Sequence, residues 1–394
     1  MRRIFGLATN VFFLGLVSLL NDFSSEMVYS VMPAFLTVVL GAPPIFVGLL
    51  EGFADALASF LKIFSGWFSD RIGKRKVLSV IGYTLSTATR AVLSVVANVW
   101  QVFVLRAIDR VGKGFRDSPR DALISESVER SEVGRSFGYH RAMDTVGGTL
   151  GPLAAVLLLP ILAGGYRSLF LIGFLFGIFA VFTFVFVRDV PRDPAKPLPK
   201  IPFTLSLRGF SRDFKFYILA VFLFGLGFMP IGLLLLQSQA LGLGAISIPL
   251  MYFVYSLSFV IFAIPFGHLS DRIGERKVLI LGFLAAIVAY AVLGFTGGAV
   301  GVFAAFIILG LYSAMTDGVQ RSLASKLAES GKLATGQGFL NAAVGISSLL
   351  AGVIGGAIWT IVGPGAALVY GIIVMFLGLV AFLIYNKYYG KDRN

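Results

Sequence analysis

Cysteine is absent from the 394 residues, so the chain can form neither a disulfide nor a thiolate metal site. Histidine occurs only at His140 and His268, and neither lies in an H-E-x-x-H pattern, which argues against an intramembrane zinc hydrolase. No phosphate-binding loop and no nucleophile–base–acid set appears in the sequence. We therefore expect no metal, no cofactor and no enzymatic activity.

Charge is also scarce. Charged residues make up 13% of the chain and apolar residues 57%, whereas a soluble domain carries about 25% charged residues. Most of the surface must therefore face lipid. A helix needs about 20 residues to cross the bilayer core, and the chain has twelve apolar segments of sufficient length, approximately 8–38, 43–68, 76–98, 99–125, 134–161, 166–188, 213–242, 246–268, 276–297, 299–329, 333–362 and 365–389. The sequence predicts an all-α membrane protein with twelve transmembrane helices.

The formal net charge of +13 comes from basic residues that gather in alternate loops. Such clusters include Arg71, Lys74, Arg75 and Lys76, then Arg272, Arg276 and Lys277, and finally Lys387, Lys391 and Arg393. The positive-inside rule places these loops and both termini in the cytoplasm. This asymmetry accounts for the charge without nucleic acid as a partner, so we expect an integral, monomeric protein of a prokaryotic plasma (inner) membrane.

One thirteen-residue phrase occurs twice, as GWFSDRIGKRKVL at Gly66–Leu78 and GHLSDRIGERKVL at Gly267–Leu279. Ten positions are identical, at an offset of 201 residues. Each copy lies between two apolar segments, which indicates a duplicated membrane protein with a pseudo-two-fold axis. We predict a six-helix bundle over 1–188, a proline-containing cytoplasmic linker over 189–212, and a second six-helix bundle over 213–394.

The repeated phrase resembles the loop signature of the major facilitator superfamily between spans 2 and 3 and its counterpart between spans 8 and 9. The matching positions are Gly66, Asp70, Arg71, Gly73, Arg75 and Lys76 in the first copy, and Asp271, Arg272, Gly274, Arg276 and Lys277 in the second. The resemblance implies a secondary transporter whose two halves rock around a central cavity. A charged cluster of this kind can latch two bundles in one state and release them in another.

The fifth span carries the spacing G-x8-G-x3-G-P at Gly138, Gly147, Gly151 and Pro152. This spacing is similar to the span-5 motif of the family's drug/proton antiporters, although that motif continues with two glycines where this chain has Ala155 and Val156. Small residues at these intervals allow close helix approach. We expect this face to press against a partner helix from the other half.

Ionisable residues far from the ends of a span usually face a cavity or a partner. Asp22 and Glu26 are four residues apart, on one face of the first span, and we expect them at the depth of Arg106 and Arg110. Arginine keeps its charge, so the carboxyl group of such a pair would titrate. The proton-coupling candidates are Asp22, Glu26, Asp55, Asp109 and Asp144, and the candidates for the substrate cavity are Asp22, Glu26, Arg106, Arg110, Arg141 and Asn341.

These features predict a proton-coupled transporter that exports hydrophobic or amphipathic small molecules, with the charged N-terminal half handling protons and an apolar, aromatic C-terminal half. Static buried ion pairs are the structural alternative for each charged residue. A second function is a carrier of an anionic metabolite or metal chelate, suggested by Arg90, Arg106, Arg110 and Arg141. A third, of another class, is a non-transporting membrane receptor or enzyme.

Overall fold

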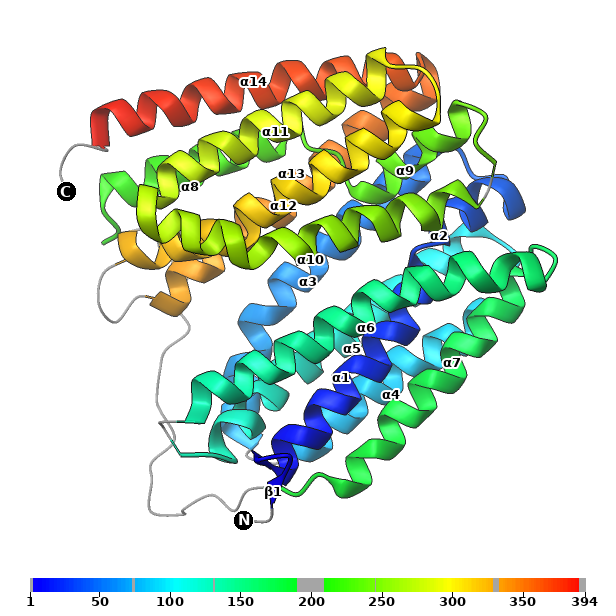
Figure 1. The fold of residues 1–394 in the computed structure, drawn as a ribbon, viewed down its shortest axis with the longest axis vertical. Coiled ribbons are helices and arrows are strands. Elements are labelled where there is room, and N and C mark those ends of the chain that lie inside the picture. Colours follow the sequence, from blue (N-terminus) through cyan, green and yellow to red (C-terminus); the bar gives the residue numbers. More distant parts are fainter. Residues whose placement is uncertain are drawn as a thin grey trace. The chain divides into compact units, whose positions relative to one another are not determined.

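The computed structural model describes residues 3–72, 75–129, 132–189, 209–244, 246–328 and 333–389, with side chains left aside at 62–72, 333, 334 and 389. This part of the chain is helical apart from a short hairpin of β1 (Arg3–Ile4) and β2 (Leu7–Ala8) (Figure 1). The prediction of an all-α protein is confirmed.

The chain forms two compact units, Met1–Met32 with Phe60–Phe203, and Pro33–Ser59 with Thr204–Asn394. The first unit holds α1 (Thr9–Tyr29), α4 (Arg75–Leu93), α5 (Val99–Glu126), α6 (Val133–Ile161) and α7 (Tyr166–Thr183), followed by the 3-10 turn η3 (Phe184–Phe186). The second holds α8 (Arg212–Gly225), α9 (Ile231–Ala240), α10 (Ser247–Ile273), α11 (Glu275–Phe295), α12 (Ala299–Leu327), α13 (Leu333–Ile361) and α14 (Pro364–Tyr389). We call them unit 1 and unit 2.

Between α1 and α3 the chain forms α2 (Met32–Ala34) and a π-helical turn, η1 (Phe35–Val39). The following helix, α3 (Pro44–Ile72), is divided, because its residues to Ser59 belong to unit 2 and the rest to unit 1. The division of the sequence at residues 188 and 213 therefore stays a prediction about the duplicated halves.

The helices follow the predicted spans closely. Nine helices of the described chain are long and apolar enough to cross a membrane. The charged helices α4 and α5 complete the first six spans, with α5 at Val99–Glu126 where 99–125 is predicted. The seventh predicted span is two helices, α8 and α9, because the chain breaks at Leu226–Pro230, where glycine and proline disfavour a continuous helix.

The internal duplication is visible in the helix packing of each unit. In unit 1, α4 packs against α5 and α7, and in unit 2 the corresponding α11 packs against α12 and α14. Likewise, α1 packs against α7 and α8 packs against α14. At the second copy of the repeated phrase, α10 and α11 are joined by Gly274 at φ +94°, a backbone conformation that favours glycine.

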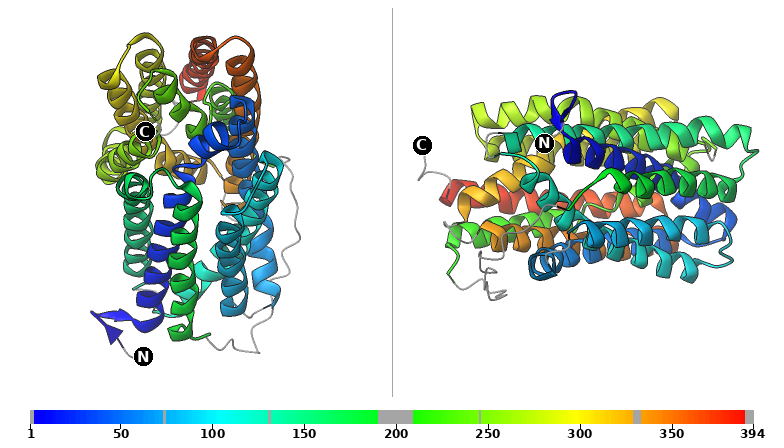
Figure 2. Two further views of the ribbon diagram at one scale, coloured as in Figure 1. Left: turned by 90° about the vertical axis from the view of Figure 1, so that its right-hand side faces the viewer. Right: turned by 90° about the horizontal axis from the view of Figure 1, so that it is seen from below.

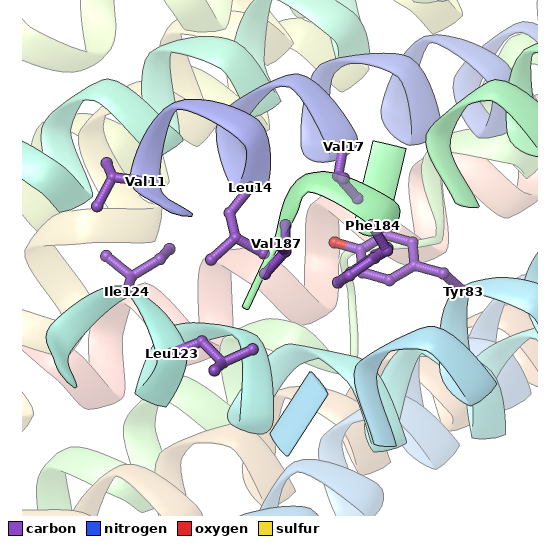
Figure 3. Packing of buried hydrophobic residues seen from close by; sticks show 8 residues of the cluster. All are labelled: Val11, Leu14, Val17, Tyr83, Leu123, Ile124, Phe184 and Val187. Atoms are coloured by element: carbon purple, nitrogen blue, oxygen red, sulfur yellow. The ribbon is translucent and has the colours of Figure 1, made fainter. Parts of the chain in front are cut away.

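An apolar cluster holds the first two turns of α1 in place (Figure 3). Its members come from α1, α4, α5 and the segment that follows α7, namely Val11, Leu14, Val17, Tyr83, Leu123, Ile124, Phe184 and Val187. Most are fully buried, and the cluster ends along α1 at Val17. The polar segment of α1 begins at the next residue, Ser18, so the apolar packing sets the depth at which that segment lies.

Helix α1 lies between α6 and α7 (Figures 1 and 2), and glycines of α6 allow the closest approach. A Cβ atom at Gly147 would overlap the carbonyl oxygen of Leu19, and one at Gly151 would lie 2.6 Å from the carbonyl oxygen of Phe23. The expectation that these glycines face a helix of the other half is wrong, because they face α1 of the same unit. The spacing identifies a small-residue face but not the helix that covers it.

This contact gives a matched pair of variants. Gly147→Ala should lower the apparent melting temperature of the purified protein in detergent, because overpacking against a backbone typically costs about 1–3 kcal/mol. Gly148→Ala should leave the melting temperature unchanged or slightly raised, since the nearest atom to its Cβ would be 3.9 Å away and alanine favours a helix by about 1 kcal/mol. Equal melting temperatures for the two variants would contradict the packing described.

Candidate functional site

The polar segment of α1 runs from Ser18 to Glu26 inside an otherwise apolar helix. Asn21 and Ser24 are fully buried, whereas Asp22 and Glu26 are half-buried. Buried polar groups need partners, and α4, α5 and α6 of the same unit supply them.

The carboxyl groups of Asp22 on α1 and Asp144 on α6 are hydrogen-bonded to each other. Ionised carboxylates only accept hydrogen bonds, so this contact requires a proton on one of the two groups. Ser18 donates to Oδ1 of Asp144 at 2.7 Å, and Arg141 donates to its Oδ2 at 3.2 Å. Both acids are predicted candidates, and the structure brings them together.

Asn21 lies between two arginines that belong to different helices. Its Oδ1 accepts hydrogen bonds from Nη2 of Arg90 on α4, at 2.9 Å, and from Nη1 of Arg116 on α5, at 3.1 Å. Arg90 is completely buried and also donates to Oγ of Ser24 at 2.7 Å. The Nδ2 of Asn21 donates to Oδ1 of Asp22 at 2.9 Å.

The predicted pairing of Asp22 with Arg106 or Arg110 is wrong, because Arg116 takes that place, with its Nη2 4.0 Å from Oδ1 of Asp22. A depth estimate from residue counts assumes that both helices begin at the membrane surface. Here Arg106 and Arg110 lie further along α1, where the ring of Tyr29 faces Arg106 at 3.6 Å. Their acidic neighbour is Asp109, at 3.8 Å from Arg106 and 2.8 Å from Arg110.

The network continues along α5 beyond Arg116. Arg116 lies 3.5 Å from Asp117, and Arg120 lies 3.5 Å from Asp117 and 2.9 Å from Asp121. Arg120 also donates to the hydroxyl of Tyr83 on α4 at 3.4 Å. Alternating signs along one helix let α5 hold this many charges within unit 1.

The remaining predicted site residues are placed as follows. Glu26 lies one turn after Asp22, next to Gly148 of α6. Within unit 2, Asp55 of α3 accepts a hydrogen bond from Ser348 of α13 at 2.9 Å, and Asn341 is half-buried on α13. Among the glycines of the fifth-span motif, Gly138 has no neighbour within 4 Å of an added Cβ, and Pro152 is buried in α6.

The predicted gating residues are described in part. In the first copy, Gly73 and Lys74 lie outside the described residues, as do the side chains of Asp70 and Arg71, and Gly66 shares that stretch. Arg75, at the start of α4, lies 2.9 Å from Glu126 at the end of α5. In the second copy, Arg276 of α11 lies 3.3 Å from Asp213 of α8. These two pairs join helices within one unit each, and a latch between the halves stays a prediction.

Unit 2 presents aromatic side chains instead of charges. The rings of Phe228 and Tyr312 are 4.5 Å apart, and the hydroxyls of Tyr255 and Ser313 are hydrogen-bonded at 2.8 Å. Phe228, Tyr255 and Tyr312 are only half-buried. This group could contact an apolar or aromatic ligand.

Asn21, Arg90 and Arg116 are the residues of the network that the sequence-based site set omits. Arg90 offered the clearest signal, because a charged residue in a predicted span needs a buried partner. Asn21 carries no charge and gave no comparable signal, and Arg116 was hidden among the many charges of α5.

Comparison with known proteins supports one family. A family model described as Major Facilitator Superfamily matches residues 14–237 and 217–394. An uncharacterized MFS-type transporter of Methanocaldococcus jannaschii is 31% identical over 385 residues, covering 96% of this chain and 95% of that protein. The multidrug resistance protein MdtH of Cronobacter sakazakii is 31% identical over only 120 residues, 30% of each chain.

Solved structures agree on the fold. The crystal structure of the nucleoside transporter NupG has a TM-score of 0.78 at 15% identity and covers 96% of this chain and 99% of its own. A POT family transporter in complex with a thioalcohol-conjugated peptide has a TM-score of 0.80 at 14% identity and covers 99% and 98%. The twelve helical segments, the duplicated packing and these matches lead to one conclusion: the chain belongs to the Major Facilitator Superfamily and is a membrane-spanning secondary transporter, not an enzyme.

Proposed function

We propose that this transporter is coupled to protons, works by alternating access, and exports hydrophobic or amphipathic small molecules. The observation that carries the proposal is the hydrogen bond between the carboxyl groups of Asp22 and Asp144. The pair holds one proton when the two groups are in contact. Losing that proton would leave two negative charges side by side in a poorly solvated place, which is costly.

The surroundings give the proton-free state an outlet. The guanidinium of Arg116 is 4.0 Å from Asp22, close enough to approach a newly formed carboxylate, and Arg141 already contacts Asp144. Loading and unloading the proton therefore favours different arrangements of α1, α5 and α6. A ligand shifts a conformational equilibrium by its differential affinity for the two states, and the proton acts here as such a ligand.

The other predicted proton-coupling acids have different environments. Asp109 has an arginine on each side, Arg106 and Arg110, and we assign it to a structural ion pair. Glu26 lies one turn from Asp22, and Asp55 accepts a hydrogen bond from Ser348 within unit 2. We propose Asp22 and Asp144 as the acids that exchange the proton, with Glu26 as a neighbouring group.

Export of amphipathic compounds is supported by three features. The fifth-span spacing resembles that of proton-linked exporters, a stretch of 120 residues is similar to a multidrug resistance protein, and unit 2 presents half-buried aromatic rings. A second candidate, a carrier of anionic metabolites or metal chelates, is favoured by the number of guanidinium groups in unit 1. Arg106 and Arg110 share the single carboxylate of Asp109 among their printed ion pairs, and Lys113 lies one turn away.

The carboxyl pair is testable without a known substrate. Infrared titration of the purified protein should show a protonated carboxyl band that disappears with rising pH, and Asp22→Asn or Asp144→Asn should remove this band. Asp317→Asn is the matched control, because Asp317 is exposed and pairs with Arg321 at 2.8 Å. A band that persists in both pair variants would overturn the assignment of the proton to these acids.

The same variants should separate coupling from folding. In everted membrane vesicles with an imposed pH gradient, wild-type protein and Asp317→Asn should accumulate a fluorescent lipophilic probe such as ethidium. Asp22→Asn should reduce this accumulation at least tenfold while retaining wild-type expression and melting temperature, since an amide cannot exchange the proton. Accumulation by Asp22→Asn at the wild-type rate would refute proton coupling through this residue.

The substrate class can be tested by thermal stabilisation. We expect lipophilic cations and neutral amphiphiles to raise the melting temperature by several degrees, because a ligand that binds only the folded state stabilises it in proportion to its occupancy. Stabilisation by organic anions alone, lost in Arg110→Gln, would instead establish the second candidate.

A further inference from the structure

The orientation of the Asn21 amide is fixed by its neighbours. Side-chain amides are often ambiguous, because oxygen and nitrogen look alike. Here one end of the amide faces the guanidinium groups of Arg90 and Arg116, which only donate hydrogen bonds. That end must be the oxygen, and the nitrogen therefore faces Oδ1 of Asp22 at 2.9 Å.

The amide is the shared acceptor of two buried cations. Within the described part of the chain, no carboxylate lies at ion-pair distance from Arg90, whose partners are Asn21 and Ser24. A neutral oxygen compensates two guanidinium charges only partly, since hydrogen bonds to a full negative charge are roughly twice as strong. The nearest carboxyl group that could add to this compensation is that of Asp22.

We propose that Asn21 is a positioning residue that links the protonation of Asp22 to the arginines of α4 and α5. This inference rests on the proposed proton coupling and extends it to three residues, Asn21, Arg90 and Arg116. While the carboxyl pair holds its proton, Arg116 stays on Asn21 and Asp117. When the proton leaves, the Asp22 carboxylate attracts Arg116, which gives up its share of the Asn21 oxygen, and Arg90 remains as the single donor there.

The exchange moves no covalent bond other than that to the proton, which passes from the Asp22–Asp144 pair to water. Its mechanical consequence is that α5 follows Arg116 toward α1, whereas α4 keeps its contact through Arg90. A purely structural asparagine would satisfy the two arginines equally in both protonation states. The two roles differ in one observable, the pH at which the carboxyl band of the pair titrates.

Asn21→Asp tests this difference. It keeps an oxygen acceptor for both arginines, so it should fold, but it replaces the N–H donor toward Asp22 with a negative charge. Both changes favour the protonated form of Asp22, and the midpoint of the infrared titration should rise by about one pH unit or more. Asn21→Ser also removes the N–H donor without adding charge, and it should raise the midpoint by less.

Asn10→Asp provides the matched control. It is the same substitution in the same helix, at a residue whose partners are Ser127 and the backbone of Arg188, away from the network. It should leave the midpoint where the wild type has it.

The outcomes separate the two proposals. A wild-type midpoint in Asn21→Asp and Asn21→Ser, with only the melting temperature changed, would show that Asn21 is structural and would overturn the inference while leaving the carboxyl pair intact. A wild-type protein without a band that Asp22→Asn removes would instead overturn the proposed function on which the inference rests.

Discussion

The close approach of α6 to α1 is the contact on which the polar interior of unit 1 depends. Gly147 and Gly151 of α6 lie against the backbone of α1 at Leu19 and Phe23. Asp144 is three residues before Gly147, on the same helical face, and Asp22 lies between the two contacted residues of α1. The glycines therefore bring the two acids into hydrogen-bonding distance, so the packing motif and the proposed proton site are one arrangement.

The cost of buried charge explains why so many polar residues gather around that contact. A single ionised group in a membrane interior is expensive, and it persists only with partners. On α5 the arginines at 106, 110, 116 and 120 each lie near an aspartate, and Tyr29 and Tyr83 add aromatic contacts. The charges that keep α5 below the apolar threshold for a span thus satisfy one another inside the unit.

The sequence predicted the helices well because hydrophobic length is a local property. It also predicted that Asp22 and Asp144 lie inside the membrane, since each interrupts an apolar segment. It could not predict that they meet, because the face of a helix does not identify the helix that covers it. The wrong partner for Asp22 has a similar origin: Arg110 and Arg116 are six residues apart on α5, and residue counting cannot fix the depth of one helix against another.

The duplication itself shows which parts of unit 1 are not required by the fold. At the offset of 201 residues, Arg90, Arg106 and Arg110 correspond to Ala291, Ile307 and Leu311. Helices α11 and α12 pack as α4 and α5 do, although these charges are missing. Because the same helix packing forms with apolar residues, the buried arginines of unit 1 are not needed to build it. Distantly similar transporters of nucleosides and peptides share this fold at 14–15% identity, so the fold leaves the interior free to differ, and the retention of costly charges in one unit supports a role in transport.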